Sequence, residues 1–394
     1  MSEDSSPAFA TYANLAEPLR VVLVGAGGMG LAWLNALTEN SDVELVAAVD
    51  LNLPLARKVL ADRGLAHLPV GSSVSQILET TSVDAVVNVT VPGAHHPVNT
   101  EALFAGLPVL CEKPIAPTVA QALSLAAASE ASGQLLMTSQ SRRYFASLCV
   151  FRDQVRSLGQ LGIATTEFFK APRFGGFRDE MDHVLLVDMA IHSFDAARYV
   201  LDSDPVAVYC EEFNPGWSWY SGAASAAATF EFENGIRYVY TGSWCSDGLE
   251  TSWNGSWRVN GSRGSASWDG ESTARIQTPD DGTLATAVVS PSAREEIRGS
   301  LAEFVAALRA GTQPSGEIHS NILSLAMVEG AVRSAEQGER ILIQTILDDA
   351  YAQALAQEAR SDVLAMLSSW GSASNGLSGD GQRMPLLAPA TSGG

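Results

Sequence analysis

The sequence predicts an α/β protein of two domains, the first built on a doubly wound parallel sheet and the second on a mostly antiparallel sheet with helices on one face. From Leu19 to about Tyr144, short runs rich in Val, Leu and Ala alternate with helix-like stretches, as in sheets buried between helices. After about Phe145 strand-like runs follow one another, and E-N-G and N-G-S-R-G indicate hairpins. Amphipathic helices are expected at Glu295–Arg309 and Ile318–Gln337.

The composition is that of a globular protein with no basic footprint. Apolar residues make up 46% and charged residues 17% of the 394 residues, enough for two full cores. The 44 acidic and 24 basic residues give a net charge of −20, which argues against a nucleic-acid partner. We expect no membrane partner, because no run approaches the ~20 apolar residues of a bilayer span and the N-terminus lacks the parts of a secretory signal. Four scattered cysteines indicate free thiols and a cytoplasmic location.

The expected division of the chain follows these changes in composition. We expect a disordered N-terminus at 1–17, the parallel-sheet domain at 18–144, the antiparallel α+β domain at 145–340, a helical segment at 341–370 and a disordered tail at 371–394. The tail is assigned to disorder because Gly, Ser and Pro dominate it and few apolar groups are available for a core.

A glycine-rich loop follows the first apolar run directly. Its G-x-G-x-x-G pattern consists of Gly25, Ala26, Gly27, Gly28, Met29 and Gly30. Gly25 would permit the tight turn, Gly27 would let the backbone approach a pyrophosphate, and Gly30 would let helix and strand pack closely. A helix that opens at Met29 would offer free N–H groups to phosphates. The context of strand, loop and helix indicates a dinucleotide-binding Rossmann domain.

The end of the next strand bears on the choice of cofactor. Asp50 lies about 20 residues beyond Gly30, where a carboxylate accepts hydrogen bonds from the adenine ribose. Asp50 would repel a 2′-phosphate, and Leu51 and Asn52 follow it rather than an arginine. We therefore expect NAD rather than NADP. The alternative is a glycine-rich turn in a Rossmann-like fold that binds something else.

Three further blocks make the chain resemble the Gfo/Idh/MocA oxidoreductases over roughly residues 19–340. Cys111-Glu112-Lys113-Pro114, at the end of the fifth strand, is similar to the family's E-K-P signature. Residues 187–195 resemble its D-x-x-x-H-x-x-D element, and residues 92–96 resemble its P-N-x-x-H loop, with glycine in place of asparagine at 93. Arg142-Arg143-Tyr144 is similar to its R-R-F segment.

The resemblance implies a nicotinamide held at the carboxyl ends of the Rossmann strands. It implies a second domain that supplies the substrate pocket and an interface for a homodimer or homotetramer. Relatives act mostly on sugars, inositols and related polyols. Beyond the glycine loop, Asp50 and Leu51, the cofactor contacts expected from it are Thr90, Pro92, His96, Glu112, Lys113 and Arg143.

The same blocks supply the expected catalytic residues. Lys113, at a strand end, would hydrogen-bond the reacting hydroxyl and stabilise alkoxide charge, as the family's lysine does. Asp188 and His192 share a helix face, and the imidazole would take the hydroxyl proton while Asp188 orients it or contacts substrate. The alternatives are a Lys113–Glu112 pair and an ordinary surface Asp/His pair. No third ligand is spaced for a metal, so we expect none.

Two local features bear on the substrate. Lys170, Arg173 and Arg178 cluster before the catalytic helix and would bind a carboxylate, phosphate or sulfonate, unless they are ordinary solvated charges. The aromatic stretches 217–220 and 253–257 offer flat faces for stacking on a sugar, although packing in the core or an interface is an equal alternative.

These features predict hydride transfer between NAD and a ring carbinol of a sugar, glycoside or polyol. The superfamily also includes NAD-dependent glycosidases, which oxidise C3 transiently, eliminate the aglycone, add water and reduce the ring again. That second hypothesis needs the same residues, and an anionic, for example sulfonated, sugar would suit the basic cluster. A third hypothesis, a cofactor-binding regulator without turnover, is disfavoured by the intact Lys113, Asp188 and His192.

Overall fold

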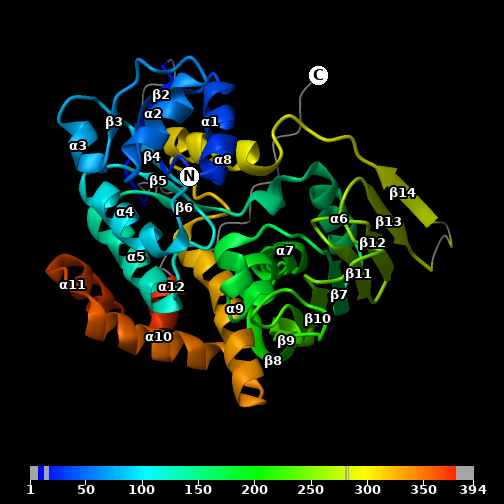
Figure 1. The fold of residues 1–394 in the computed structure, drawn as a ribbon. Coiled ribbons are helices and arrows are strands. Elements are labelled where there is room, and N and C mark those ends of the chain that lie inside the picture. The colour runs from blue at the N-terminus through cyan, green and yellow to red at the C-terminus, as the bar shows by residue number, and fades with distance from the viewer. Residues whose placement is uncertain (1–7, 13–16, 280–281, 283, 379–394) are drawn as a thin grey trace, which may run out of the picture. The chain divides into compact units, whose positions relative to one another are not determined.

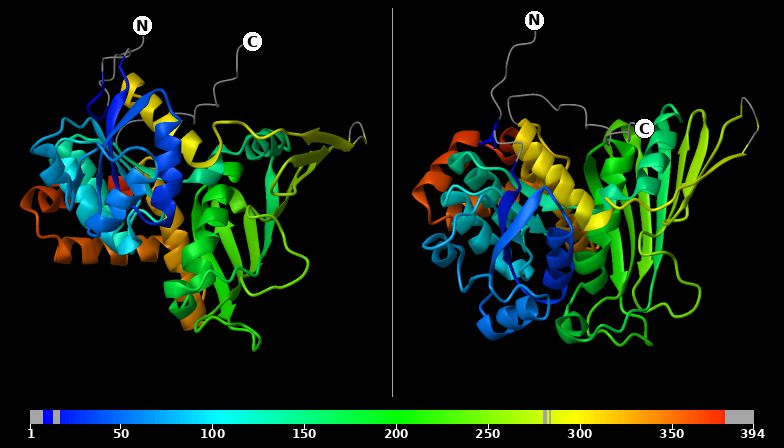
Figure 2. Two further views of the ribbon diagram at one scale, coloured as in Figure 1. Left: turned by 45° about the horizontal axis from the view of Figure 1, so that its top comes forward. Right: turned by 90° about the horizontal axis from the view of Figure 1, so that it is seen from above.

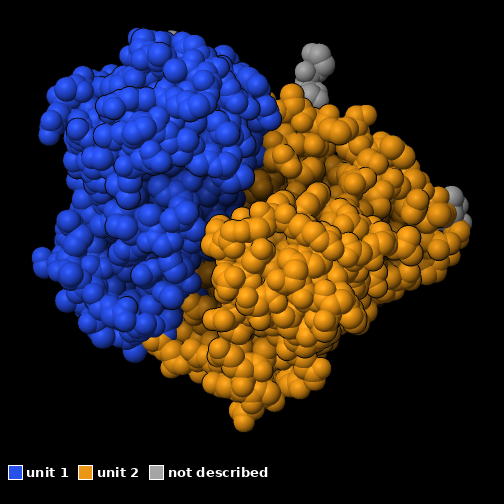
Figure 3. All heavy atoms as spheres, viewed as in Figure 1, with its two compact units in different colours: residues 1–139, 297–322, 350–394 blue, residues 140–296, 323–349 orange. Residues whose placement is uncertain are grey.

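The computed structural model describes residues 8–12, 17–279, 282 and 284–378. They form two compact units, which Figure 3 shows in different colours. Unit 1 consists of residues 1–139, 297–322 and 350–394, and unit 2 of residues 140–296 and 323–349. The structure thus divides the chain differently from the predicted continuous domains 18–144 and 145–340, because two later segments return to the first unit.

Unit 1 is built on a six-stranded parallel sheet with the order β3-β2-β1-β4-β5-β6. The strands are β1 (Leu19–Val24), β2 (Val43–Val49), β3 (Val70–Gly71), β4 (Ala85–Asn88), β5 (Val109–Glu112) and β6 (Leu136–Ser139). The side chains of β4, β5 and β6 are buried throughout, as parallel strands covered on both faces require. The predicted doubly wound sheet is confirmed.

Helices connect the strands of unit 1. They are α1 (Gly28–Thr38), α2 (Leu53–Ala61), α3 (Val74–Leu78), α4 (Pro92–Phe104) and α5 (Val119–Ser132). The helix α4 begins at Pro92, whose missing N–H suits the first helical position. The segment at 92–96, predicted as a loop, is therefore helical.

The later segments add helices to unit 1, and α11 packs on α5 (Figure 1). They are α8 (Glu296–Ala310), α9 (Ile318–Gln337), which continues into unit 2, α10 (Ile343–Gln357), α11 (Ser361–Trp370) and α12 (Ala373–Ser378). The prediction of disorder from residue 371 onward is wrong at α12, and its remainder at 379–394 lies outside the described residues. Within the described part of the chain, no helix is both long and apolar enough to cross a membrane.

The predicted disorder at 1–17 is also wrong in part. Ala10 N donates to Gly133 O at 2.9 Å and Tyr12 N donates to Leu308 O at 2.9 Å, so this short segment is fixed to unit 1. The Tyr12 hydroxyl also donates to Asp84 O at 2.9 Å. Residues 1–7 and 13–16 of the predicted segment are not among the residues that the structure describes.

Unit 2 is built on a nine-stranded sheet with the order β14-β13-β12-β11-β7-β10-β9-β8-β15. The strands are β7 (Leu161–Phe169), β8 (Pro205–Phe213), β9 (Ser225–Phe232), β10 (Arg237–Ser243), β11 (Ser256–Gly261), β12 (Gly264–Trp268), β13 (Thr273–Gln277), β14 (Leu284–Val288) and β15 (Ile341–Leu342). Every neighbouring pair is antiparallel except β7 and β10. Both predicted hairpins, β9–β10 and β11–β12, are confirmed.

Helices cover one face of this sheet, as Figure 2 shows for α6 (Ala146–Arg156) and α7 (Ile191–Leu201). The buried face carries large side chains such as Phe230, Tyr238 and Trp257, which stack on one another. The alternate residues of β9 lie on the exposed side, which is the pattern of an antiparallel sheet packed on one face only.

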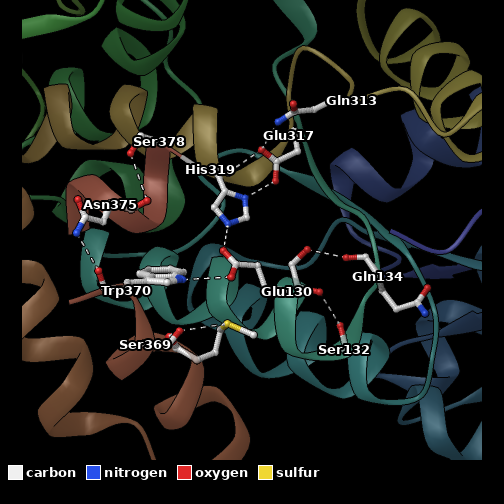
Figure 4. Close-up of polar contacts among 12 residues, drawn as sticks. Glu130, Ser132, Gln134, Gln313, Glu317, His319, Ser369, Trp370, Asn375 and Ser378 are labelled. Carbon is white, nitrogen blue, oxygen red and sulfur yellow. Dashed lines mark hydrogen bonds and ion pairs between the residues drawn. The ribbon is translucent and has the colours of Figure 1, made fainter. Parts of the chain in front are cut away.

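A histidine held by two glutamates joins the C-terminal helices to unit 1 (Figure 4). His319 lies 2.6 Å from a carboxylate oxygen of Glu317 and 2.7 Å from one of Glu130, at the end of α5. Trp370, the last residue of α11, donates its indole N–H to the other oxygen of Glu130 at 3.1 Å. Although burial opposes it, the two carboxylates raise the pKa of His319 to about 10. The imidazolium thus keeps two acidic groups together beneath α11.

We predict that His319→Gln destabilises unit 1 in a pH-dependent way. A histidine whose pKa is raised from 6.5 to about 10 on folding contributes stability that is complete below pH 6.5 and disappears as pH rises through 10. The loss should be about 2 kcal/mol below pH 6.5, since the pair is mostly buried, and should vanish above pH 10. Urea unfolding across this pH range measures it, with the exposed His67→Gln as control. An equal loss at both ends of the range would contradict the account.

Candidate functional site

The glycine loop after β1 has the shape that a dinucleotide requires. Gly25 has a φ of +104°, and a Cβ there would lie 2.8 Å from Val89 O. A Cβ on Gly30 would lie 2.3 Å from Gly25 O, so helix α1 packs against the loop only with glycine at this position. The space beside Gly27 and Gly28 is open. The predicted roles of the glycines agree with this geometry, and the loop leaves room for a pyrophosphate at the start of α1.

Asp50 follows β2 and holds the glycine loop by a hydrogen bond. One carboxylate oxygen accepts the backbone N–H of Ala26 at 2.7 Å, and the other accepts that of Asn52 at 2.7 Å. The adjacent Leu51 is 91% exposed, and Met29 on α1 is 49% exposed. A carboxylate flanked by exposed apolar side chains at the carboxyl end of a parallel sheet fits the ribose and adenine of a dinucleotide. The residues present therefore fit the predicted NAD.

Glu112 is a buried carboxyl between the phosphate-binding helix and Lys113. Trp33 of α1 donates its indole N–H to one oxygen at 2.8 Å, and the backbone N–H of Lys113 donates to the other at 3.1 Å. Burial raises the pKa of the Glu112 carboxyl, although both donors oppose the shift. Both oxygens are thus taken by the protein's own donors. These two hydrogen bonds hold Glu112 beside Lys113, and its expected contact with the cofactor remains a prediction.

The structure places His95, rather than the predicted His96, at the sheet edge. The ring nitrogens of His95 lie 2.7 Å from Pro114 O and 2.9 Å from Thr90 O, so this buried ring ties the segments after β4 and β5 together. The ring of His96 instead contacts the hydroxyl of Ser124 on α5 at 3.0 Å. Burial lowers the pKa of both rings. The ring of His96 is thus turned toward α5, and its expected contact with the cofactor remains a prediction.

In unit 2, Asp188 and His192 lie on two helices of different geometry. The helix predicted to carry Asp188 and His192 begins as the π-helix η3 (Leu185–Ala190) and continues as α7. Such π-turns are frequent at functional sites. The guanidinium of Arg178 donates to the two oxygens of Asp188 at 2.6 and 3.4 Å, which fixes the orientation of the carboxylate. The sequence identified both residues but not this connection.

A small pocket surrounds His192. Its wall includes Trp253, Trp257, Asn254 and Arg142. Trp257 is buried, whereas Trp253 is 40% exposed. The packing alternative thus holds for Trp257, and Trp253 keeps a face that a ligand can reach. The pocket has a volume of about 10 Å³, which is room for about one water molecule, so it does not enclose a ring. The imidazole, amide and guanidinium at its wall are groups that can hydrogen-bond a hydroxylated molecule lying beside it.

Arg142 is a pocket residue that sequence analysis missed, although it precedes the predicted Arg143. Its side chain is mostly buried, and the nearest carboxylate, that of Glu296, is 3.9 Å away. Burial lowers the pKa of Arg142, with Glu296 opposing. Its buried Nε has no hydrogen-bond partner in the described part of the chain. Arg142 can therefore donate to a molecule in the pocket.

The predicted anion-binding cluster is already paired with acidic residues. The shortest contacts are Lys170 to Glu250 at 2.8 Å, Arg173 to Asp247 at 2.9 Å and Arg178 to Asp188 at 2.6 Å. Because each cation has its own carboxylate, the cluster offers no excess positive charge to an anionic substrate. Two of the three carboxylates lie far away in the sequence, and binding of an anionic substrate by this cluster remains a prediction.

Arg143 forms a buried ion pair within unit 2. Its guanidinium donates to both oxygens of Asp195 at 2.7 and 2.6 Å, and both side chains are buried. The Ser324 hydroxyl of α9 donates to the same carboxylate at 2.7 Å. The second arginine of the R-R-F-like segment and the last aspartate of the D-x-x-x-H-x-x-D-like element thus hold each other. The expected contact of Arg143 with the cofactor remains a prediction.

No group of three or more His, Cys, Asp or Glu side chains in the described residues is arranged to hold a metal ion. The expectation that the protein needs no metal remains a prediction.

We predict that Arg143→Lys lowers the stability of unit 2 without weakening NAD binding. A lysine keeps the charge but cannot form the bidentate contact with Asp195, so the loss should be about 2 kcal/mol. Chemical unfolding and NAD titration measure the two effects. Arg156→Lys, at an exposed pair with Asp202, is the matched control and should cost under about 0.5 kcal/mol. Weaker NAD binding with unchanged stability would contradict this assignment.

Comparison with known proteins agrees with the geometry. The family model described as "Oxidoreductase family, NAD-binding Rossmann fold" matches residues 19–140, and the "GFO/IDH/MocA C-terminal domain" matches residues 158–267. The 1,5-anhydro-D-fructose reductase of Ensifer adhaerens is 25% identical over 343 residues, which are 82% of this chain and 98% of the relative. Inositol 2-dehydrogenase 4 of Saccharopolyspora erythraea is 31% identical over 194 residues, 48% of this chain and 56% of the relative.

A solved oxidoreductase from Agrobacterium radiobacter, in complex with NAD+, L-tartaric acid and magnesium, has the same fold. It is 18% identical, with a TM-score of 0.77 over 84% of this chain and 99% of that one. The two family models match in order, and together they cover more than half of the sequence. The chain belongs to the Gfo/Idh/MocA oxidoreductases, with an NAD-binding Rossmann domain in unit 1.

Proposed function

We propose that this protein transfers a hydride between NAD and a ring carbinol of a sugar, glycoside or polyol. The observation that carries the proposal is the edge of the unit 1 sheet. There the glycine loop after β1, Asp50 after β2 and Lys113 after β5 follow the carboxyl ends of three parallel strands of one sheet. In open α/β sheets this edge is where ligands bind. NAD, when bound, accepts or returns the hydride.

The protein's own residues would handle the proton and the charge. The ammonium group of Lys113 would hydrogen-bond the reacting hydroxyl and stabilise negative charge on its oxygen. The imidazole of His192 would remove the hydroxyl proton as the hydride leaves. Asp188, held by Arg178, would contact the substrate or orient the imidazole. Arg142 would donate to a further substrate oxygen from the His192 pocket.

The substrate class is supported by the pocket and by the relatives. The His192 pocket offers aromatic, amide and guanidinium groups, which suit a ring rich in hydroxyls. Two relatives are named as an inositol dehydrogenase and an anhydrofructose reductase. We also propose a homodimer or homotetramer, and a cytoplasmic location that suits the four free cysteines. The glycosidase hypothesis loses the support of an anionic substrate, because the basic cluster is paired with carboxylates.

The proposal is tested by incubating the protein with NAD and a panel of inositols, aldoses and their methyl glycosides in heavy water. NADH absorbance and proton NMR are followed together. We expect net NADH and a keto product in equal amounts. Free sugar that carries deuterium at C2, with no net NADH, would replace this proposal with the glycosidase hypothesis.

We predict that Lys113→Met lowers kcat about 10³-fold, because the charge that forms on the reacting oxygen loses its stabilising cation. The Kd for NAD should change by less than about threefold, since most of the binding energy comes from other contacts. Steady-state kinetics and NAD titration measure both values. The exposed Lys58→Met is the matched control and should have wild-type kinetics. Normal turnover in the Lys113 variant would refute its catalytic role.

A further inference from the structure

Three aromatic side chains of unit 2 form an exposed surface, the aromatic wall. Phe174 and Phe177 are each 58% exposed and Trp253 is 40% exposed. The phenylalanines lie between β7 and η3, and Trp253 lies between β10 and β11. Large aromatic side chains gathered in solvent commonly mark a binding site.

The wall is held in place from behind. The rings of Phe174 and Trp253 stack with centroids 6.2 Å apart and an interplanar angle of 21°. Buried Trp244 packs edge-on against Phe174 at 6.3 Å. The guanidinium of Arg178 lies 5.6 Å from the centre of the Phe174 ring and 4.7 Å from that of Phe177. These contacts order the rings before a ligand arrives, which lowers the entropic cost of binding.

The wall is continuous with the residues proposed for catalysis. Trp253 is part of the wall and also lines the pocket of His192. Arg178, which lies over both phenylalanines, holds the carboxylate of Asp188. A molecule whose reacting ring lies at His192 and Asp188 would therefore extend its other end along the wall.

Polar groups border the wall and indicate the chemistry of that other end. The Lys170–Glu250 and Arg173–Asp247 ion pairs are both partly exposed, so their donors and acceptors can reach hydroxyl groups. Lys170 also lies 5.1 Å from the centre of the Trp253 ring. Flat aromatic faces with hydrogen-bonding groups at their borders fit a second sugar ring better than a purely apolar partner.

We propose that the aromatic wall is a subsite for a second sugar ring, so that the substrate is a disaccharide or larger glycoside rather than a single ring. This inference rests on the proposed sugar or polyol function.

The test measures binding of sugars to the NAD-loaded full chain by isothermal titration. Single rings (D-glucose and D-galactose) are compared with two-ring probes (cellobiose, maltose and lactose) and with phenyl β-D-glucoside. We expect at least one two-ring probe to bind about tenfold more tightly than its single ring. Phe174→Leu should remove about fivefold of that preference and leave the single ring unaffected, because leucine keeps the bulk but lacks the ring face. Phe174→Tyr keeps an aromatic face and should bind two-ring probes as tightly as the unchanged protein does. Leu249→Ala, at an exposed position outside the wall, should leave the affinity for both classes of sugar unchanged.

Other outcomes overturn the subsite. They are equal affinity for one and two rings, absence of binding by every two-ring probe, an equal loss for both classes in Phe174→Leu, or tighter binding of the phenyl glucoside than of any disaccharide. NADH formation is recorded in the same samples. Turnover without a two-ring preference would overturn the subsite alone, whereas a two-ring preference without turnover would overturn the proposed oxidoreductase reaction alone.

Discussion

The candidate site in unit 1 depends on one buried carboxyl group. Glu112 accepts one hydrogen bond from the indole N–H of Trp33, which lies on the phosphate-binding helix α1. It accepts another from the backbone N–H of the next residue, Lys113. A buried carboxyl that lost either donor would be left with an unmet hydrogen bond, which is costly. The start of α1 and the Lys113 segment are therefore fixed relative to each other. His95 adds a second constraint by joining the carbonyl groups of Thr90 and Pro114 at the same edge.

Unit 2 uses ion pairs for the same purpose. The buried Arg143–Asp195 pair joins the start of the unit to α7, the helix that carries His192. The Arg178–Asp188 pair orients the carboxylate proposed to act with His192 and supports the two phenylalanines of the aromatic wall. The charged residues near this site thus position other groups, and the pocket presents aromatic and polar surface rather than net positive charge to a ligand.

The sequence predicted the helices and strands better than the contacts between side chains that are distant in the chain. The parallel sheet, both hairpins and the helix Ile318–Gln337 follow from local periodicity and turn residues, and all are present. The different positions of the His95 and His96 rings follow from the start of α4 at Pro92, since one helical residue turns a side chain by about 100°. The carboxylates that pair with Lys170 and Arg173 lie 80 and 74 residues later, a distance that no local pattern reveals.

The central claim is that a hydride passes directly between a sugar or polyol carbon and NAD. The most direct measurement uses carbon-deuterated inositols and sugars with unlabelled NAD, and follows deuterium at C4 of the nicotinamide by NMR. The account predicts NADH that carries one deuterium for each keto product formed. A keto product formed together with NADH that carries no deuterium would contradict it.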